Sequence, residues 1–193
     1  DLNLINKTYL WKIKIKKDTK LGKNLTLTGM MGVGKSTIGK ILAKKLNYNF
    51  IDVDKLIEAK EGASINLIFK NKSENYFRKI ERETTLLELK KNNSVISLGG
   101  GAFINNTIRK KTKKLSTSFW LDVPIEELIK RLKKNKKRPL LFKKNLSDTV
   151  KKIYLERKKT YSEANFKIRC ERLKPLLIVN KIIDLYEYSA DKI

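Results

Sequence analysis

The chain alternates short runs of apolar residues with longer stretches in which apolar residues recur at helical spacing. Five apolar runs predict β-strands, and they occupy residues 24–29, 49–54, 94–100, 116–123 and 165–170. Helices are predicted between them, because apolar residues share one helical face in the sets Ile38, Ile41, Leu42, Leu46 and Ile125, Leu128, Ile129, Leu132. This alternation predicts an α/β fold of three layers (α/β/α), with a five-stranded parallel sheet covered by helices on both faces. Such folds bind ligands at the carboxyl ends of the strands.

Residues 1–23 differ from the rest of the chain. The run YLWKIKIKK alternates apolar residues with Lys, which fits either a half-exposed edge strand or a disordered basic arm. We assign this N-terminal extension no function. Residues 24–193 are enough for one sizeable hydrophobic core, and we expect them to form a single domain.

The segment GMMGVGKST, from Gly29 to Thr37, contains G-x-x-x-x-G-K-S directly after a predicted strand and directly before a predicted helix. Glycines let such a loop turn tightly and point its amides at an anion, at the positive end of the helix. Lys35 is expected to reach the β and γ phosphates of a nucleotide, and the Ser36 hydroxyl to coordinate Mg²⁺. The predicted phosphate-binding residues are Gly29, Gly32, Val33, Gly34, Lys35, Ser36 and Thr37.

Nucleotide binding alone does not define the reaction. A signalling GTPase would carry the guanine-reading pattern N-K-x-D, but in the nearest match, NKIID from Asn180, Ile183 stands where Asp is required. A motor or helicase usually has a longer chain and an apolar strand with an acidic end, whereas SVISLGG ends in glycines. A small phosphotransferase remains.

Asp52 and Asp54 alternate at the end of the second predicted strand, where a period of two turns both side chains to the same side. Beside a nucleotide, one carboxylate suits the water shell of Mg²⁺ and the other suits proton transfer from an acceptor hydroxyl. The alternative is that Asp54 caps a helix starting near Lys55.

Glycines 99–101 follow a strand and leave backbone amides open to a ligand, unless they form an ordinary tight turn. In the helix predicted around residues 76–83, Glu81 lies one turn after Arg78 and is placed to hold its guanidinium while the free edge grips an anion. A plain surface ion pair is the alternative. The apolar face of this helix is expected to contain Phe77, Ile80, Thr84 and Leu87.

Arg157 lies within an apolar stripe, so we expect it to be partly desolvated and to have an anionic partner. That stripe contains Val150, Ile153, Tyr154 and Tyr161. The basic segment 134–145, with Arg138 before Pro139, fits a lid whose arginine moves onto the transferring phosphate, or else an exposed Lys-rich loop.

The net charge of +25 suggests nucleic-acid binding, but Lys supplies 37 of the 45 basic residues, as expected for A- and T-rich coding DNA. A solvated Lys coat explains such a charge, so we expect no specific nucleic acid. Each Arg then becomes a stronger candidate for gripping carboxylate or phosphate.

The chain has no His and one Cys, which excludes Cys/His zinc sites, His-based triads and an internal disulfide. Without a secretory signal or membrane-spanning run, we expect a cytoplasmic protein with no membrane partner.

Taken in order, several fragments resemble the shikimate kinase family of small P-loop kinases: GMMGVGKSTIG, IDVD, FRKIE, SLGGGAF, WLD, RPLL and Arg157 four residues before Tyr161. The resemblance covers nearly all of residues 24–162. It implies a P-loop kinase fold with acceptor-binding helices and a lid at about 134–146, ATP and shikimate as substrates, and Mg²⁺ as cofactor. It implies phosphorylation of the 3-hydroxyl of shikimate, in the route to chorismate and the aromatic amino acids. We expect a monomer.

The resemblance also implies roles for individual residues. Asp54 would bind the acceptor hydroxyls and accept the proton, and Asp52 would hold Mg²⁺ through water. Arg78 and Arg157 would clamp the substrate carboxylate. The remaining implied contacts are the amides of Gly100 and Gly101 on the substrate, Arg131 near adenine and Arg138 on the phosphates, so that the catalytic set is Lys35, Asp54 and Arg138. A late adenine contact around residues 169–175 is left unassigned.

Two alternatives stay open at this point. One is a kinase for another small polyol acid, such as gluconate, although paired arginines around a compact pocket favour a carboxylated ring. The other is a nucleotide-dependent RNA-binding protein, for which the chain shows no aromatic and basic stacking motif.

Overall fold

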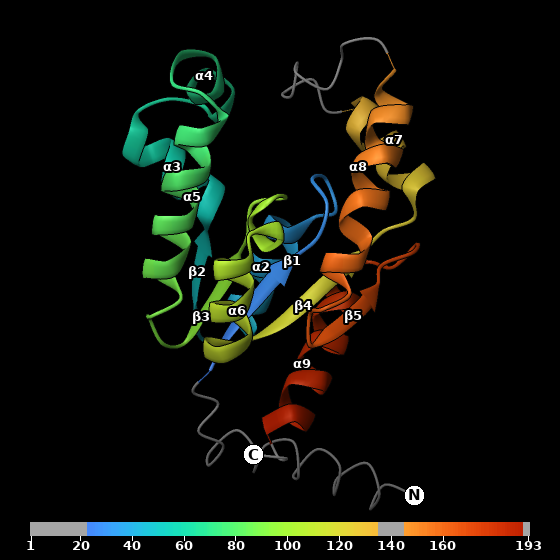
Figure 1. The fold of residues 1–193 in the computed structure, drawn as a ribbon. Helices are drawn as coiled ribbons and strands as arrows, with labels where there is room; N and C mark the ends of the chain where they lie inside the picture. The colour runs from blue at the N-terminus through green and yellow to red at the C-terminus, as the bar shows by residue number, and fades with distance from the viewer. Residues whose placement is uncertain (1–22, 135–144, 191–193) are drawn as a thin grey trace, which may run out of the picture.

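Five parallel strands lie at the centre of the molecule, in the order β2-β3-β1-β4-β5 (Figure 1). Their bounds are β1 Asn24–Thr28, β2 Asn49–Asp52, β3 Ser94–Ser97, β4 Ser116–Asp122 and β5 Phe166–Arg169. The computed structural model describes residues 23–134 and 145–190. Within this part of the chain the five predicted strands and their parallel arrangement are confirmed.

β1 occupies the middle of the sheet, with β3 on one side and β4 on the other. All five of its residues are buried, as expected for a strand covered on both faces. The Thr26 hydroxyl lies 2.6 Å from Ser116 Oγ, so these buried polar groups satisfy each other. The loop after Thr28 therefore begins at the centre of the carboxyl edge of the sheet.

Helices cover both faces of the sheet. α2 and α9 pack against each other on one face, and α6 packs on β4 at the other face with α5 beside it. In Figure 1, α3, α4 and α5 form one group above the β2 end of the sheet, and α7 and α8 form another above the β5 end. The helices are α2 Lys35–Leu46, α3 Val53–Glu61, α4 Ile65–Asn71, α5 Glu74–Glu88, α6 Asn106–Leu115, α7 Ile125–Lys134, α8 Leu146–Tyr161 and α9 Pro175–Ala190, with a 3₁₀ turn, η1, at Ala102–Ile104.

The connections after β1 and β3 diverge to opposite faces of the sheet. The chain leaves β1 into α2, whereas it leaves β3 into η1 and α6. Neighbouring parallel strands with diverging connections create a crevice at their carboxyl ends, where α/β proteins bind ligands. The loop 29–34 and the glycine segment 99–101 border this crevice.

The predicted strands over residues 49–54 and 94–100 are too long, because β2 ends at Asp52 and β3 ends at Ser97. β2 ends at Asp52, whose carboxylate accepts a hydrogen bond from the backbone N of Lys55 at 3.3 Å and caps α3. Asp54 therefore lies in the first turn of a helix, and the strand period does not apply to it. The capping residue is Asp52, not Asp54.

The predicted face of α5 is partly wrong. Leu87 is 60% exposed, although Phe77 and Thr84 are buried as expected. The buried face turns instead toward Glu81, Thr85 and Glu88. The predicted apolar faces of α2, α7 and α8 are confirmed.

Some predictions fall outside the described residues. They include the N-terminal extension up to residue 22, and Arg138 with most of the predicted lid. No helix of the described part is long and apolar enough to cross a membrane.

Candidate active site

The loop between β1 and α2 has the backbone that an anion site requires. Gly29 and Gly34 have φ angles of 133° and 97°, which residues with a side chain rarely adopt. A Cβ on Gly29 would also lie 2.6 Å from the backbone O of Leu121 on β4. Gly34 precedes α2 with no side-chain cap, so the first amides of the helix are left for a ligand.

Lys35 and Ser36 open α2 inside this loop. The Lys35 ammonium is buried and donates to the backbone oxygens of Gly29 and Met30 at 2.8 and 3.0 Å, which holds it across the loop. The Ser36 hydroxyl donates to Asp52 Oδ2 at 2.5 Å, so residues from two neighbouring elements meet beside the loop. The remaining loop residues differ in exposure, with Val33 buried and Thr37 exposed.

The pair Ser36 and Asp52 fits Mg²⁺. A hydroxyl and a carboxylate are hard oxygen ligands, and Mg²⁺ beside phosphates typically uses only one or two protein ligands together with waters and phosphate oxygens. The described residues contain no cluster of three or more His, Cys, Asp and Glu that would form a self-sufficient metal cage. The donor set therefore fits a cation that arrives with the nucleotide.

Two carboxylates occupy the space above Gly99. A Cβ on this glycine would lie 2.5 Å from Asp54 Oδ1 and 2.5 Å from Glu81 Oε1. Glu81 is only 2% exposed, and its Oε1 has no hydrogen-bond partner among the described residues. Burial raises the pKa of Glu81, and the neighbouring charge of Asp54 adds to the rise.

Arg78 lies over Gly101, with its Nη1 2.6 Å from the position that a Cβ there would occupy. The same Nη1 donates to Glu81 Oε2 at 2.8 Å, and Nη2 and Nε contact Glu74. Burial alone would lower the pKa of Arg78, but the charges and hydrogen bonds of Glu81 and Glu74 raise it, so the guanidinium stays charged. The predicted support of Arg78 by Glu81 is confirmed.

Arg157 approaches the same glycine segment from α8. Its Nη1 donates to the backbone O of Gly100 at 2.9 Å, and the buried Tyr161 hydroxyl donates to the same oxygen. The hydrogen-bond partner of Arg157 is thus a backbone carbonyl, and its charge also interacts with the nearby carboxylate of Glu81. The predicted half-buried position is confirmed. A partly desolvated cation held by a dipole keeps a strong preference for an anionic ligand.

Arg131 lies on the other side of the loop. It donates to the backbone O of Val33 at 3.4 Å and pairs with Glu127 one turn earlier on α7. This contact places Arg131 beside the phosphate loop, on the side away from Arg78. Arg138 lies outside the described residues.

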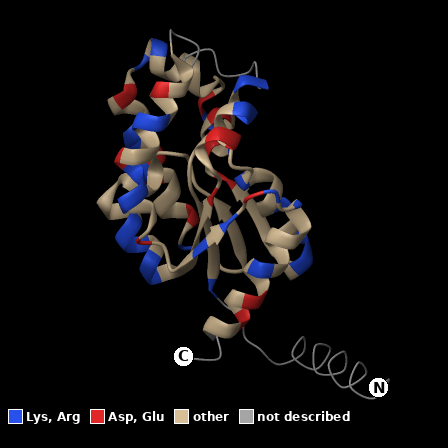
Figure 2. Ribbon diagram, turned by 90° about the vertical axis from the view of Figure 1, so that its right-hand side faces the viewer, with Lys and Arg blue, Asp and Glu red and all other residues tan. Residues whose placement is uncertain are grey.

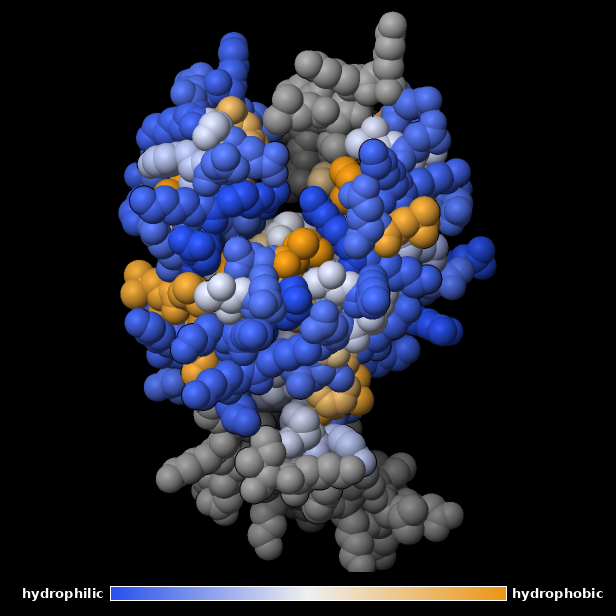
Figure 3. Space-filling model, in the orientation of Figure 1, coloured by the Kyte–Doolittle hydropathy of each residue, from blue (hydrophilic) through white to orange (hydrophobic). Residues whose placement is uncertain are grey.

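Together these groups form two adjacent sets. One consists of loop amides, Lys35 and the Ser36–Asp52 pair, which suit phosphates and a divalent cation. The other consists of Arg78, Arg157 and Asp54 around glycines 99–101, which suit a small carboxylic acid with hydroxyl groups. A Cβ on Gly100 would lie 3.3 Å from the backbone N of Met31, so the sets are in contact. The surface is hollowed between the α3–α5 group and the α7–α8 group above them (Figure 3).

Several contacts of this site have no local signal in the sequence. The Tyr161 hydroxyl on Gly100 joins residues 61 positions apart, and Tyr161 was predicted only as part of an apolar stripe. Tyr154 similarly donates to Asp122 Oδ1 at 2.9 Å, and burial raises the pKa of this tyrosine to about 12. Polar tips on otherwise apolar helix faces are the one hint that the sequence offers.

Comparison with known proteins decides between families of phosphotransferases. The family model described as shikimate kinase matches residues 31–187. The chain belongs to the shikimate kinase family. It is 44% identical over 161 residues to the shikimate kinase of Sulfurihydrogenibium sp., covering 83% of this chain and 96% of that protein. It is 42% identical over 161 residues to that of Persephonella marina, covering 83% of this chain and 97% of that protein.

Solved structures of the family agree with this fold. A shikimate kinase from Acinetobacter baumannii in complex with shikimate has a TM-score of 0.83 at 30% identity, over 86% of this chain and 94% of the other. The shikimate kinase of Aquifex aeolicus has a TM-score of 0.77 at 38% identity, over 86% of this chain and 98% of the other. A gluconokinase from Sinorhizobium meliloti shares the fold alone. Its TM-score is 0.55 at 13% identity, over 88% of this chain and 94% of the other.

Proposed function

We propose that this chain transfers the γ-phosphoryl group of ATP to the 3-hydroxyl of shikimate and produces shikimate 3-phosphate and ADP. The observation that carries the proposal is the convergence of Arg78, Arg157 and Asp54 on glycines 99–101 beside the phosphate loop. Membership of the family supports the reaction, and the Acinetobacter baumannii structure with shikimate supports the acceptor. Such a kinase serves the route to chorismate and the aromatic amino acids.

On the nucleotide side, the loop amides and Lys35 would bind the phosphates, and Arg131 would lie near the adenine. Amides and an ammonium aimed at phosphoryl oxygens stabilise the negative charge of the transition state without reorganising. Lys35 already spans the loop in the described structure, so a β/γ-phosphate would replace its two carbonyl partners. We assign Arg138 to the phosphates as well, which is the role that the family resemblance implies for it.

Ser36 would coordinate Mg²⁺ directly, and Asp52 would hold it through water. Bound there, the ion neutralises charge on the β and γ phosphates. The 2.5 Å contact between the Ser36 hydroxyl and Asp52 supports this pairing, because it keeps both oxygens on the same side of the loop.

On the acceptor side, Arg78 and Arg157 would clamp the carboxylate of shikimate, and the amides of Gly100 and Gly101 would contact the other side of the substrate. Asp54 would bind the hydroxyls and accept the proton of the 3-hydroxyl. The new bond then forms between that oxygen and the γ-phosphorus as the bond to the ADP oxygen breaks. Because the two sets of groups are in contact, the enzyme acts mainly by aligning the reactants and excluding water.

We further propose a cytoplasmic monomer with no specific nucleic-acid partner. Cys170, the single cysteine, is buried, and burial raises the pKa of its thiol to about 12, which fits a protein without disulfides. In Figure 2, Lys and Arg occur on helices on both sides of the sheet, which supports a solvated Lys coat over a nucleic-acid stripe.

The test is ADP release by the purified chain with ATP and Mg²⁺, compared among shikimate, gluconate and no acceptor. Strict dependence on shikimate is expected. Lys35→Ala and Asp54→Ala should abolish turnover, whereas Arg78→Ala should mainly raise the KM for shikimate. Equal release without an acceptor would refute the proposal, and dependence on gluconate would replace shikimate as its acceptor.

A further inference from the structure

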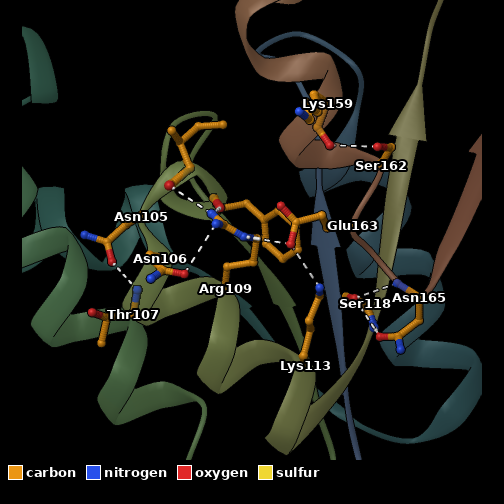
Figure 4. Close-up of polar contacts among 12 residues, drawn as sticks. Asn105, Asn106, Thr107, Arg109, Lys113, Ser118, Lys159, Ser162, Glu163 and Asn165 are labelled. Atoms are coloured by element: carbon orange, nitrogen blue, oxygen red, sulfur yellow. Dashed lines mark hydrogen bonds and ion pairs between the residues drawn. The ribbon is translucent and has the colours of Figure 1, made fainter.

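A polar cluster joins η1 and α6 to the turn after α8 (Figure 4). Its centre is Arg109 on α6, whose side chain is 17% exposed. Nη1 donates to the backbone oxygens of Phe103 and Ile104 at 3.1 and 3.0 Å, and Nη2 donates to Asn106 Oδ1 at 3.4 Å. Arg109 thus holds the end of η1, the turn that directly follows glycines 99–101.

The third guanidinium nitrogen of Arg109 reaches a different part of the chain. Nε contacts Glu163 Oε2 at 3.2 Å, and Lys113, one turn along α6, contacts the same oxygen at 3.0 Å. Glu163 lies in the turn after α8, two residues beyond Tyr161. Lys113 and Arg109 hold the pKa of Glu163 below its usual range, so the Glu163 carboxylate is ionised at neutral pH.

The turn that carries Glu163 is itself fixed to the sheet. Asn165 Oδ1 accepts from the backbone N and hydroxyl of Ser118 at 2.9 and 2.7 Å, and the Asn165 backbone N donates to Ser118 Oγ at 3.0 Å. Ser118 lies within β4, next to the central strand. A continuous series of contacts therefore runs from β4 through Glu163 and Arg109 to the carbonyls of η1.

We propose that Arg109 is a positioning residue for the acceptor: it holds the segment Gly99–Ile104 in register with α8, so that the amides of Gly100 and Gly101 and the guanidinium of Arg157 meet the same substrate molecule from their two sides. This proposal rests on the proposed function. Its basis is that two separate contacts join this segment to α8 and the turn after it. One is the hydrogen bond of Arg157 to Gly100 O, and the other runs from the η1 carbonyls through Arg109 to Glu163.

The contact through Arg109 and Glu163 matters because the contact through Gly100 O lies in the proposed binding site itself. Arg157 must face the substrate, and its bond to Gly100 O is the one that an incoming carboxylate perturbs. Glycines 99–101 carry no side chains that pack and so cannot fix their own position. Arg109 donates from Nη1 to two carbonyls and from Nη2 and Nε to two side chains, and its side chain is partly desolvated, which are the conditions for strong, directional hydrogen bonds.

The test compares Arg109→Gln with Lys113→Gln. Both variants remove a cation from α6 and a contact to Glu163, but only Arg109 touches the carbonyls of η1. Arg109→Gln should raise the KM for shikimate about tenfold with a much smaller change in the KM for ATP, whereas Lys113→Gln should stay within about twofold of the wild type. Arg109→Lys, which keeps the charge but has one nitrogen in place of three and so cannot hold η1, Asn106 and Glu163 together, should recover only part of the affinity.

Hydrogen exchange supplies a second readout that needs no substrate. In Arg109→Gln the amides of residues 99–104 should exchange about tenfold faster, and in Lys113→Gln they should not change. Glu163→Gln, which keeps every carbonyl contact, should change both readouts in the same direction but less, and it remains available should Arg109→Gln fail to fold.

Equal effects of Arg109→Gln and Lys113→Gln on the KM for shikimate would overturn the proposal, as would equal rises in the KM for shikimate and for ATP. Unchanged exchange over residues 99–104 would overturn it independently of activity. Absence of shikimate-dependent ADP release in the wild type would refute the proposed function instead, and the exchange data would still decide whether Arg109 holds the glycine segment.

Discussion

Gly101→Ala should weaken shikimate binding without unfolding the protein. A Cβ at this position would lie 2.6, 3.0 and 3.1 Å from Nη1, Cζ and Nη2 of Arg78. The backbone of Gly101, at φ −103° and ψ −13°, has a negative φ that residues with a side chain can adopt, so the substitution adds little backbone strain. Ordinary contacts begin near 3.5 Å, so the guanidinium has to move by about 1 Å.

The size of the effect follows from the bond that this movement breaks. Arg78 Nη1 donates to Glu81 Oε2 at 2.8 Å, and a displacement of about 1 Å takes such a bond beyond hydrogen-bond range. Hydrogen bonds that involve charged groups contribute about 1.5–3 kcal/mol. If the lost alignment of Arg78 appears in acceptor binding, the KM for shikimate should rise by about 10- to 150-fold. The melting temperature should also fall by several degrees while the protein stays folded, because the buried carboxylate of Glu81 loses this hydrogen bond.

The assay is initial-rate ADP release at saturating ATP and Mg²⁺, with shikimate varied, for Gly101→Ala, Arg78→Ala and the double variant. If the added methyl group acts through Arg78, the double variant should be no worse than Arg78→Ala alone. Gly100→Ala is the matched comparison, because its Cβ would lie 3.9 Å from Arg157 Nη1 and displaces neither arginine. Full additivity in the double variant, or an unchanged KM in Gly101→Ala, would refute this reasoning.

Two further predictions concern the carboxylates. Ser36→Ala removes the hydroxyl that donates to Asp52, so the Mg²⁺ concentration giving half-maximal rate should rise at least about fivefold; an unchanged magnesium titration would contradict the assignment. Because burial raises the pKa of Glu81 above its ordinary 4.5, the native state holds this proton more tightly than the unfolded chain. The free energy of unfolding of the wild type, relative to that of Glu81→Gln, should therefore fall as pH rises from about 4.5 through the native pKa. Denaturant unfolding at a series of pH values measures this difference, and a rise with pH would contradict the prediction.

The phosphate loop could be predicted because its chemistry is local. Its glycines, Lys35 and Ser36 are consecutive, and the apolar strand before them and the amphipathic helix after them define the backbone that they adopt. The order of strands and helices follows for the same reason, since each element has its own periodicity. No residue far along the chain is needed to recognise either.

The boundary between β2 and α3 was predicted wrongly because two local signals compete there. Period-two alternation across Asp52 and Asp54 favours a strand, whereas an Asp three residues before Lys55 N favours a helix cap. The cap prevails, and the two carboxylates separate. Asp52 turns to Ser36, and Asp54 turns to Gly99 from the helix.

The exposed position of Leu87 and the burial of Glu81 have a common cause in tertiary packing. α5 packs against α3, α4 and α6, and its C-terminal half turns polar residues inward, where Glu81 meets Arg78 and the glycine segment. Helical periodicity reports which residues share a face, but not which face a binding site requires. A buried carboxylate on an otherwise amphipathic helix is justified only by partners that lie elsewhere in the sequence.

The glycine segment shows why a site can be recognised in outline and still be incomplete in detail. Read from the sequence, three consecutive glycines expose amides. In the structure, the space that a Cβ would fill is taken by Asp54 and Glu81 at Gly99, by the approach of the phosphate loop at Gly100, and by Arg78 at Gly101. Each missing side chain thus admits a different functional group, delivered by α3, α5 or the loop after β1. Alanine at Gly99 should therefore disturb the two carboxylates, alanine at Gly100 the contact with the phosphate loop, and alanine at Gly101 the arginine that clamps the acceptor. Each substitution perturbs one group, which makes the glycines a more selective probe of this site than removal of the charged residues.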